Sequence, residues 1–473
     1  MKSTQIIAVD LDGTLSITDT LHESVLKLVR KKPLVLFFLP IWLINGIAFL
    51  KFKVAESSGL DVTALPYNLL LIEWLKEQKA SGKKIILCTG ANQLIASAVS
   101  KHLKLFDDVI ASDATNNLKS VEKRKELDNR FGYKCYDYVG NSKADIKVWA
   151  GANQAIVVNA SKTVLKKAEA VTDVSKFFER QSINFSHWRH VFRLHHWIKN
   201  LLLFVPLLAA HQFGNIHSLN SLLIAFFSFS FCASSVYISN DLLDLDNDRK
   251  HPHKRYRPFA SAVVPIQYGV VLIPIFAILS LVLGLSVGSG FTIWLISYFI
   301  LTTAYSLYLK QFVLIDCLTL AGLYTLRIIA GTAAVSGTLS FWLLAFSAFI
   351  FLSLAFVKRY AELQLQDRTG NIDSYGRGYN IKDAPLVQSF GVTAGYAAVL
   401  VLALYLNGET VIKLYTQPEL IWFAVPLVLF WVSWIWIKAH RGEMHDDPIV
   451  FALKDRISQI SAICLSCLFL MAI

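Results

Sequence analysis

The sequence predicts two architectures in one chain: an α/β domain, followed by an all-α bundle of nine transmembrane helices. Residues 1–185 read as strand-like segments that alternate with helix-like ones, which is typical of a doubly wound parallel sheet. From about residue 195 onward, apolar runs of about 18 or more residues recur, and each is long enough to cross a bilayer. Hydrophobic residues make up 54% of the chain, which is too much for a wholly soluble enzyme.

The first predicted strand ends in a pair of acids. The apolar segment 6–9 leads directly into D-x-D-G-T at 10–14, which resembles the first motif of the haloacid dehalogenase (HAD) phosphohydrolases. In that resemblance the strand end presents Asp10 as the nucleophile and Asp12, two residues on, as the acid or base. Residues 1–170 are therefore expected to form a HAD-like phosphohydrolase with a helical cap insertion.

Two later segments resemble the phosphate-binding motifs of the same family. The segment 84–90 reads as a second strand, and it ends in Thr89, which would bind phosphate. A lysine follows in the segment 117–123. Lys123 is the preferred candidate because it would open the next helix, and Lys119 is the alternative.

The fourth motif departs from the family's usual form. The segment 138–145 resembles the metal-holding motif, which implies that Asn141 and Asp145 join Asp10 and Asp12 around Mg²⁺. Asn stands at 141 where the family usually has Asp, so the site loses a charge, although the amide oxygen can still bind the metal. An active phosphatase is the favoured interpretation, and a relic or regulatory domain is the alternative.

Two segments of the N-terminal part need separate interpretation. The run 33–49 is apolar and flanked by cations, but a membrane span there would place the α/β domain across two compartments. It is therefore predicted to be a helical insertion that packs on the soluble domain or lies on the membrane surface. Residues 171–190 are polar and include Trp188, which predicts a linker or an interfacial helix.

Nine spans account for the apolar runs of the membrane part, residues 191–473. They are expected at 195–211, 218–240, 263–285, 290–308, 313–335, 339–360, 385–406, 418–437 and 449–471.

The loops between these spans alternate in charge. Cations concentrate in the loops 241–262, 358–384 and 438–448 and at Lys310, whereas the opposite loops carry only Lys413. By the positive-inside rule, the basic loops, the N-terminal domain and both candidate sites face the cytoplasm, and the C-terminus lies outside. The expected location is a bacterial-type inner membrane.

An acidic segment stands where the second predicted span ends. Within 240–248, Asp241, Asp244 and Asp248 are spaced three and four residues apart and would share one helical face. Three carboxylates on one face repel each other unless a hard cation neutralises them, and Mg²⁺ shared with a diphosphate is the usual solution. A basic run at 251–258 follows at once and would hold the remaining phosphate charge.

The acidic segment, which begins with Asn240, resembles the first aspartate-rich motif of the UbiA-type intramembrane prenyltransferases. The segments 193–200, which contains Lys199, and 305–310 also resemble parts of that family. The resemblance covers about 187–473 and implies a Mg²⁺-dependent transferase that acts on a lipid substrate.

The second motif of that family is altered here. Many members carry a second aspartate pair after the sixth span, but at 358–362 this sequence reads K-R-Y-A-E. Two cations and one acid imply substrates with more negative charge than a single prenyl diphosphate brings. Together with 251–258, 445–448 and 454–456, this run resembles the decaprenyl-phosphate phosphoribosyltransferase branch.

That branch implies a reaction and a set of binding residues. 5-Phosphoribose would move from phosphoribosyl diphosphate to a polyprenyl phosphate, which is already anionic and needs no general base, and pyrophosphate would leave. Arg327 is a candidate because a charge inside a span normally faces the bundle interior; its alternative is a buried ion pair with Asp316. The expected substrate-binding residues are Lys199, Asn240, Lys254, Arg255, Arg257, Arg327, Lys358, Arg359 and Glu362.

The combined prediction is a bifunctional membrane enzyme of cell-envelope sugar synthesis. Its expected partners are the membrane, polyprenyl phosphate and phosphoribosyl diphosphate, and no nucleic acid. The fused phosphatase would remove the 5-phosphate of the lipid product. The alternative is a prenyltransferase with an aromatic acceptor and a degenerate or regulatory HAD domain, and a transporter or scaffold is the rival from another class.

Overall fold

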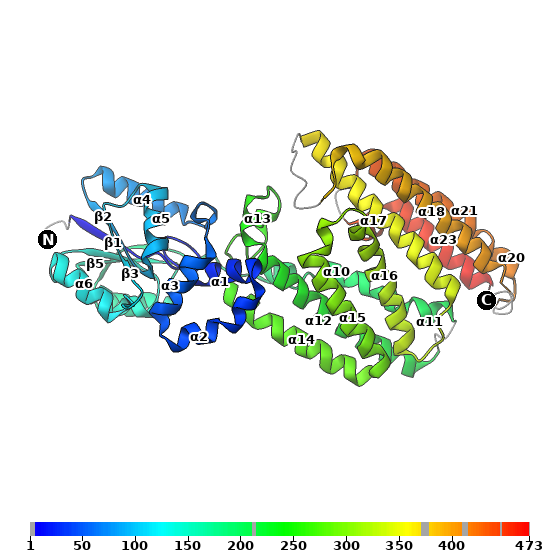
Figure 1. Ribbon diagram of the computed structural model, residues 1–473, viewed down its shortest axis with the longest axis horizontal. Helices are drawn as coiled ribbons and strands as arrows, with labels where there is room; N and C mark the ends of the chain where they lie inside the picture. Colours follow the sequence, from blue (N-terminus) through cyan, green and yellow to red (C-terminus); the bar gives the residue numbers. More distant parts are fainter. Residues whose placement is uncertain (1–4, 211–213, 370–377, 409–414, 445–446, 473) are drawn as a thin grey trace. The chain divides into compact units, whose positions relative to one another are not determined.

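The chain divides into two compact units. The first contains Met1–Phe192 together with Ile238–Leu272, and the second contains Arg193–Tyr237 and Ile273–Ile473. The first unit thus holds the acidic segment and the basic run as well as the α/β domain. The computed structural model describes residues 5–210, 214–369, 378–408, 415–444 and 447–472 (Figure 1).

The first unit is built on a six-stranded parallel sheet of order β3-β2-β1-β4-β5-β6. The central strand β1 (Ile6–Val9) pairs with β2 (Lys84–Asn92) on one side and β4 (Asp137–Gly140) on the other. The strand order reverses between β1 and β4, and ligands of doubly wound sheets bind at the carboxyl ends of the strands at such a point. The remaining strands are β3 (Asp108–Ser112), β5 (Gln154–Val158) and β6 (Asp173–Phe178).

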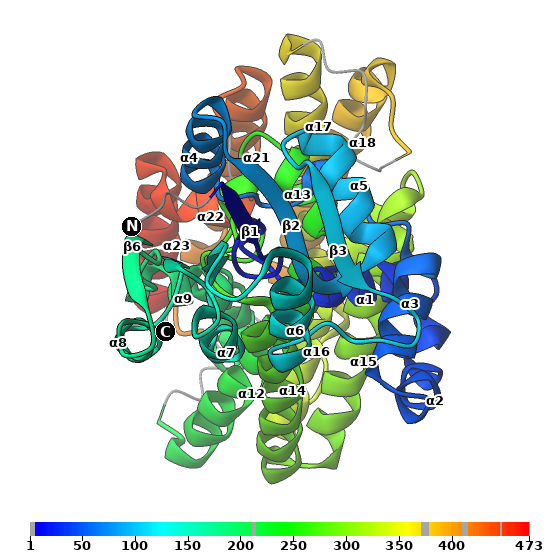
Figure 2. The ribbon, with the colours of Figure 1, turned by 90° about the vertical axis from the view of Figure 1, so that its left-hand side faces the viewer.

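Helices cover both faces of this sheet, as the sequence predicted. Ile7 and Val9 of β1 face one core and Ala8 faces the other, because side chains alternate along a strand. Ile95 packs in the first core and Leu127 in the second, so their helices α5 and α6 lie on opposite faces (Figure 2). The helices that cover the two faces are α4 (Leu69–Ala80), α5 (Gln93–Leu103), α6 (Val121–Phe131), α7 (Ile146–Trp149) and α8 (Lys162–Glu169).

The predicted helical insertion follows β1. Asp19 caps α1 (Thr20–Lys31) by accepting hydrogen bonds from the Leu21 and His22 N–H groups. The apolar run 33–49 forms short helices, and its longest apolar helical stretch, Pro33–Ile44, is too short to be a membrane span. The elements are η1 (Pro33–Phe37), α2 (Leu39–Ile44), α3 (Ile47–Ser58) and the 3₁₀ turn η2 (Val62–Ala64).

The rest of the first unit joins the α/β domain to membrane helices. Strand β6 lies inside the segment predicted as a linker and extends the sheet, and α9 (Phe185–Val191) forms the helix expected near Trp188. Asn184 caps α9 through a reciprocal pair of hydrogen bonds with His187. The acidic segment and basic run contain α13 (Leu245–Lys250) and η5 (Lys254–Tyr256).

Seven helices among the described residues are long and apolar enough to cross a membrane. They correspond to seven of the predicted spans, because uninterrupted apolar runs of this length favour helices with all backbone groups paired. They are α12 (Ile216–Leu243), α14 (Ile266–Val287), α15 (Ser289–Leu307), α16 (Ile315–Ala334), α17 (Phe341–Thr369), α18 (Ala384–Leu406) and the stretch Pro418–His440, which comprises α20 (Pro418–Ile421) and α21 (Ala424–His440).

The predicted count of nine spans is not confirmed. The described part of the predicted span 195–211 forms three short pieces, α10 (Leu194–Trp197), η4 (Ile198–Phe204) and α11 (Val205–Ala209). The last predicted span is bent by 83° between α22 (Pro448–Lys454) and α23 (Arg456–Ala472), so it counts as an eighth only if the pair is one broken span. Asp455 explains the bend, because its carboxylate accepts the Ser458 N–H at 2.9 Å and starts a new helix.

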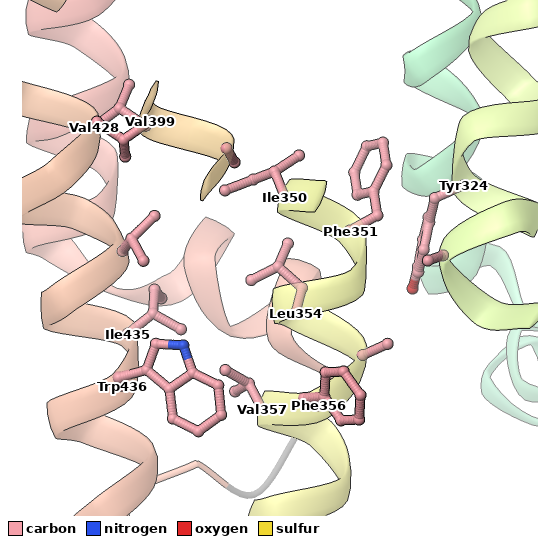
Figure 3. Packing of buried hydrophobic residues seen from close by; sticks show 14 of the residues in the cluster. Tyr324, Ile350, Phe351, Leu354, Phe356, Val357, Val399, Val428, Ile435 and Trp436 are labelled. Carbon is pink, nitrogen blue, oxygen red and sulfur yellow. The ribbon is translucent and has the colours of Figure 1, made fainter. Parts of the chain in front are cut away.

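A buried cluster joins the helices that carry the polar residues of the second unit (Figure 3). Trp436 of α21 donates its indole N–H to Ser353 Oγ of α17 at 3.1 Å, and Ser353 donates to the Gly391 carbonyl of α18 at 2.7 Å. A Cβ at Gly391 would lie 2.1 Å from the Trp436 ring, so only glycine lets α18 approach this closely. Tyr324 places α16 against Phe351 of the same cluster.

Candidate active sites

The first candidate site lies at the carboxyl end of β1. Lys123 Nζ is 2.9 Å from Asp10 Oδ1, and the same ammonium group donates to the Tyr138 hydroxyl at 2.8 Å. Asp12 Oδ1 accepts the Thr20 N–H at 2.8 Å. The structure thus brings together Asp10, Asp12 and the preferred lysine, because α6 starts beside the strand ends.

The fourth-motif loop approaches the same point. Asp145 Oδ1 accepts the Tyr138 hydroxyl at 3.0 Å, and Oδ2 accepts the Asn141 and Ser142 N–H groups at 3.1 and 2.9 Å. A Cβ at Gly13, where φ is +72°, would lie 2.0 Å from Asn141 Nδ2. Glycine at 13 therefore lets Asn141 lie against the loop that carries both catalytic candidates.

A cavity of about 530 Å³ opens at these residues. Its polar lining includes predicted residues and also cations from the insertion and from the loop before α6. Thr89 is fully buried, its Oγ1 accepts the Ala91 N–H at 3.0 Å, and its binding of phosphate stays a prediction. The lining residues used below are Asp10, Asp12, Ile47, Lys51, Lys119, Lys123, Asn141, Asp145 and Ile266.

The two acids of this site are adapted to different tasks. Burial, followed by the charge of Asp19, raises the pKa of Asp12 to about 7, so this acid can hold and release a proton near neutral pH. Burial also raises the pKa of Asp10, against the opposing effect of Lys123. Burial alone would lower the pKa of Lys123, but Asp10 and Asp145 outweigh it and raise this pKa, so the ammonium stays charged.

Sequence reasoning missed two members of this site. Tyr138 links the Lys123 ammonium to the Asp145 carboxylate through its hydroxyl. Lys51 donates to the Gly90 carbonyl at 2.6 Å and to Asn117 Oδ1 at 2.9 Å, and it lines the cavity. Tyr138 opens the segment 138–145 but lies in a strand that reads as core, so its hydroxyl was not assigned a role, and Lys51 belongs to the insertion, which carries no motif.

The second candidate site is the acidic segment. Arg257 Nη1 lies 3.0 Å from Asp241 Oδ1 and 2.6 Å from Asp248 Oδ2, so two carboxylates share one cationic nitrogen. Burial raises the pKa of Asp248; Arg257 opposes this effect and Asp241 adds to it. Both acids are almost fully buried, so their mutual repulsion makes a cation necessary.

Asp244 does not share this arrangement, contrary to the expected single face. It stands between α12 and α13, and its Oδ1 is 2.9 Å from Arg30 Nη2 at the end of α1. Asp246 pairs with Lys27 at 2.7 Å. In the part of the chain that the structure describes, no group of three or more His, Cys, Asp or Glu side chains is gathered as a metal site.

Three other residues predicted to bind substrate, Asn240, Lys254 and Arg255, flank the two acids in the sequence and differ in their contacts and exposure. The Asn240 carbonyl accepts the Asp244 N–H at 2.9 Å within the helix. Lys254 is half-buried in η5. Arg255 is exposed and donates to the Tyr256 hydroxyl at 2.6 Å.

A pair of cations meets one carboxylate in the second unit. Lys199 Nζ lies 2.7 Å and Lys358 Nζ 3.3 Å from Asp447 Oδ2. Lys199 is 5.5 Å from the centre of the Tyr324 ring, whose hydroxyl donates to Asp447. The two predicted lysines thus converge, and within the described residues their one shared carboxylate is that of Asp447. His445 and Asp446 of the same predicted motif lie outside the described residues.

Arg327 is buried in α16 among neutral partners. It donates to Asn200 Oδ1 at 2.9 Å, to the Tyr298 hydroxyl at 2.9 Å and to the Leu323 carbonyl at 2.6 Å. The alternative of an ion pair with Asp316 is wrong, because Asp316 pairs with another arginine. Its hydrogen-bond partners within the described residues are neutral groups, and a charge so held remains available to an anion.

Arg359 is the arginine that pairs with Asp316. Its Nη2 lies 2.7 Å from Asp316 Oδ2, its Nη1 contacts Glu362, and the Tyr379 hydroxyl donates to Asp316 Oδ1 at 2.7 Å. Arg359 and Asp316 are 1% and 0% exposed at their side chains. Both acids thus engage Arg359 in the packing between α16 and α17.

Comparisons with known proteins show the family of the membrane part. A model of the UbiA prenyltransferase family matches residues 201–454. The uncharacterized protein y4nM of Sinorhizobium fredii is 33% identical over 98% of this chain and 90% of its own length. The nodulation protein NoeC of Azorhizobium caulinodans is 37% identical over 57% of this chain and 87% of its own length.

A named enzyme also matches. The decaprenyl-phosphate phosphoribosyltransferase of Mycolicibacterium smegmatis is 32% identical over 56% of this chain and 85% of its own length. The family model covers more than half of the chain, and the apolar helices agree with a multi-pass membrane protein. The chain belongs to the UbiA prenyltransferase family, and an α/β domain with a parallel sheet precedes the residues that the family model matches.

Proposed function

We propose that this enzyme transfers 5-phosphoribose from phosphoribosyl diphosphate to a polyprenyl phosphate. The observation that carries the proposal is the pair Lys199 and Lys358 on one Asp447 oxygen. Two cations on one described carboxylate suit a lipid phosphate, because a phosphate monoester brings more negative charge than the single carboxylate of an aromatic acid. The name of the M. smegmatis relative supports the same reaction.

The acidic segment fits Mg²⁺, because Asp241 and Asp248 already converge on one cationic nitrogen. These two acids would hold the metal, and Asp244 would join them only after release from Arg30. Held there, Mg²⁺ would supply positive charge to the diphosphate of the donor and so favour the departure of pyrophosphate. Arg257, Lys254 and Arg255 would bind its remaining charge.

Each further step is assigned to residues of the chain. Lys199, Lys358 and Arg327 orient phosphate groups, and their charges favour the anionic acceptor in the site. A lipid phosphate oxygen forms a bond to C1 of the ribose while the bond from C1 to the pyrophosphate oxygen breaks. No base is required, because the attacking oxygen is already deprotonated.

The acceptor distinguishes this reaction from its alternative. Purified full-length chain should form labelled lipid from phosphoribosyl diphosphate and polyprenyl phosphate, and Lys358→Gln should raise the KM for the lipid phosphate. Lys438→Gln is the matched control, because Lys438 pairs with Glu443 elsewhere on the surface. Transfer from a prenyl diphosphate to an aromatic acid, with no labelled ribosyl lipid, would instead establish the prenyltransferase.

The HAD-like domain is proposed to remove the 5-phosphate of the lipid product. In the mechanism that the HAD resemblance implies, Asp10 attacks phosphorus, the ester P–O bond breaks, and Asp12 gives its proton to the leaving oxygen. Water then hydrolyses the aspartyl phosphate, with Asp12 as the base. The raised pKa of Asp12 and the contact of Lys123 with Asp10 support these roles.

Magnesium is also proposed for this cavity: Asp10, Asp12, Asn141 and Asp145 all line it and would have to draw together to hold the metal. Bound there, it would neutralise the phosphate under attack. Asp10→Asn should cause the phosphorylated lipid to accumulate while transfer continues. Wild-type chain that releases no phosphate from that lipid would favour the relic or regulatory domain instead.

We place both activities on the cytoplasmic side of a bacterial inner membrane. The support is the concentration of cations in 241–262, 358–384 and 438–448, which the positive-inside rule assigns to the cytoplasm. Protease protection in oriented vesicles tests this placement: cleavage of the HAD-like domain from the periplasmic side would contradict it.

A further inference from the structure

The insertion carries an exposed apolar surface. Leu34, Phe37 and Ile44 are 70%, 75% and 85% exposed, although their neighbours Val35 and Ala48 are buried and fix the insertion to the domain. The exposed apolar side chains of this surface, here called the apolar hairpin, are Leu34, Leu36, Phe37, Phe38, Ile41, Leu43, Ile44 and Ile47. So many large apolar groups in one short segment mark a binding surface rather than ordinary surface variation.

Cations stand at the start of the apolar hairpin. Arg30, Lys31 and Lys32 directly precede it and are exposed, and acids are absent from the run 33–49. An apolar surface edged by cations complements a bilayer with anionic headgroups, in which apolar groups enter the acyl boundary and cations remain at the phosphates.

The hairpin is tied to the end of a membrane span. Helix α1, which leads into it, holds the α12–α13 junction through Arg30 and Asp244, and Arg30 Nη1 donates to the Leu243 carbonyl at 3.2 Å. Leu243 is the last residue of α12, a helix long and apolar enough to cross the membrane.

A second contact connects α1 to the segment that follows α12. The guanidinium of Arg249 forms two hydrogen bonds with the Glu23 carboxylate, at 2.6 and 3.1 Å, and both side chains are nearly buried. The helix η1, which carries the start of the apolar hairpin, begins at Pro33, two residues after α1 ends, so these contacts connect the hairpin through α1 to the end of α12.

We propose that the apolar hairpin is a lipid-binding element that inserts into the bilayer surface. It holds the phosphatase cavity against the membrane, because Ile47 of the hairpin and Ile266, the first residue of the membrane helix α14, both line that cavity. The phosphoester that enters is therefore one carried by a membrane lipid. This last consequence rests on the proposed phosphatase, whereas the insertion itself does not.

Photocrosslinking tests the insertion directly. A benzophenone side chain at Phe37 or Ile44, in the full chain in nanodiscs of phosphatidylcholine and phosphatidylglycerol, should give at least about fivefold more lipid adduct than one at Leu70. Leu70 is the matched control because it is 69% exposed on α4 of the same unit. Equal lipid adducts at the three positions, or adducts to protein in place of lipid, would overturn the proposal.

Kinetics test the consequence. The double variant Phe37→Ser/Ile44→Ser should lower kcat/KM for a polyprenyl-linked phosphoester about tenfold and leave that for soluble p-nitrophenyl phosphate unchanged. Leu69→Ser/Leu70→Ser should change neither. Equal losses on both esters would mean that the hairpin acts through the fold of the cavity and would overturn lipid delivery. Wild-type chain inactive on both esters would refute the phosphatase, while the adducts still decide the insertion.

Discussion

Replacing Arg359 with glutamine should destabilise the second unit, because it leaves the buried Asp316 carboxylate without its counterion. The two side chains are 2.7 Å apart and almost fully inaccessible to solvent. Removing one partner of such a pair costs about 3–5 kcal/mol, because the remaining charge stays buried. Tyr379 still donates to Asp316, so the lower end of that range is expected.

The assay is unfolding of the purified full chain in mixed micelles, followed by tryptophan fluorescence as the denaturing detergent fraction rises. Asp316→Asn should lower the free energy of unfolding by a similar amount, and Asp316→Asn/Arg359→Gln should cost less than the sum. Lys358→Gln is the matched control: it should cost under about 1 kcal/mol, because Lys199 still neutralises Asp447.

An unchanged stability of the Arg359→Gln variant would favour the substrate-binding role that the sequence suggested for Arg359. If Arg359→Gln unfolds like the wild type but raises the KM for phosphoribosyl diphosphate, Arg359 is a phosphate ligand and the buried pair contributes little to stability.

Three further predictions concern the first unit. Gly13→Ala should abolish phosphatase activity without loss of ribosyl transfer, because the new methyl would meet Asn141; Gly82→Ala, which has a positive φ but no neighbour within 4 Å, should leave both activities intact. Arg30→Gln should change the free energy of unfolding by less than about 1 kcal/mol, because the pair is partly exposed, and larger losses would contradict this. A hydrogen bond from Lys250 lowers the pKa of Asp61 to about 2, so this pair stabilises the fold above the ordinary Asp pKa and the effect is lost as pH falls toward 2. Asp61→Asn should remove under about 1 kcal/mol of acid-dependent stability in that window, and an unchanged pH profile would refute the pair.

Much of the α/β domain could be predicted because its motifs are local. Asp10 and Asp12 follow β1 directly, and Lys123 lies in the first turn of α6. Once a parallel sheet was assumed, these positions next to strand and helix ends predicted that the three side chains would meet. Hydropathy likewise located seven helices, since a long apolar run has few alternatives to a span.

The predictions for the last span and for Asp244 failed because each depended on a contact that sequence patterns do not show. Hydropathy averages over single residues, so it did not detect that Asp455 caps a helix and bends the last predicted span. Sequence spacing likewise gave Asp244 the same role as Asp241, but a guanidinium more than two hundred residues earlier in the chain, that of Arg30, holds Asp244 instead. Partners this distant in sequence leave no local pattern.

The central claim is that the acidic segment binds Mg²⁺ and with it the diphosphate of a ribosyl donor. The direct measurement is formation of labelled polyprenyl lipid from labelled phosphoribosyl diphosphate as Mg²⁺ is titrated against wild type, Asp241→Asn and Asp248→Asn. Wild-type transfer should require the metal, and each variant should lose at least about a hundredfold in rate. Undiminished transfer in both variants, or in the presence of excess chelator, would contradict the claim.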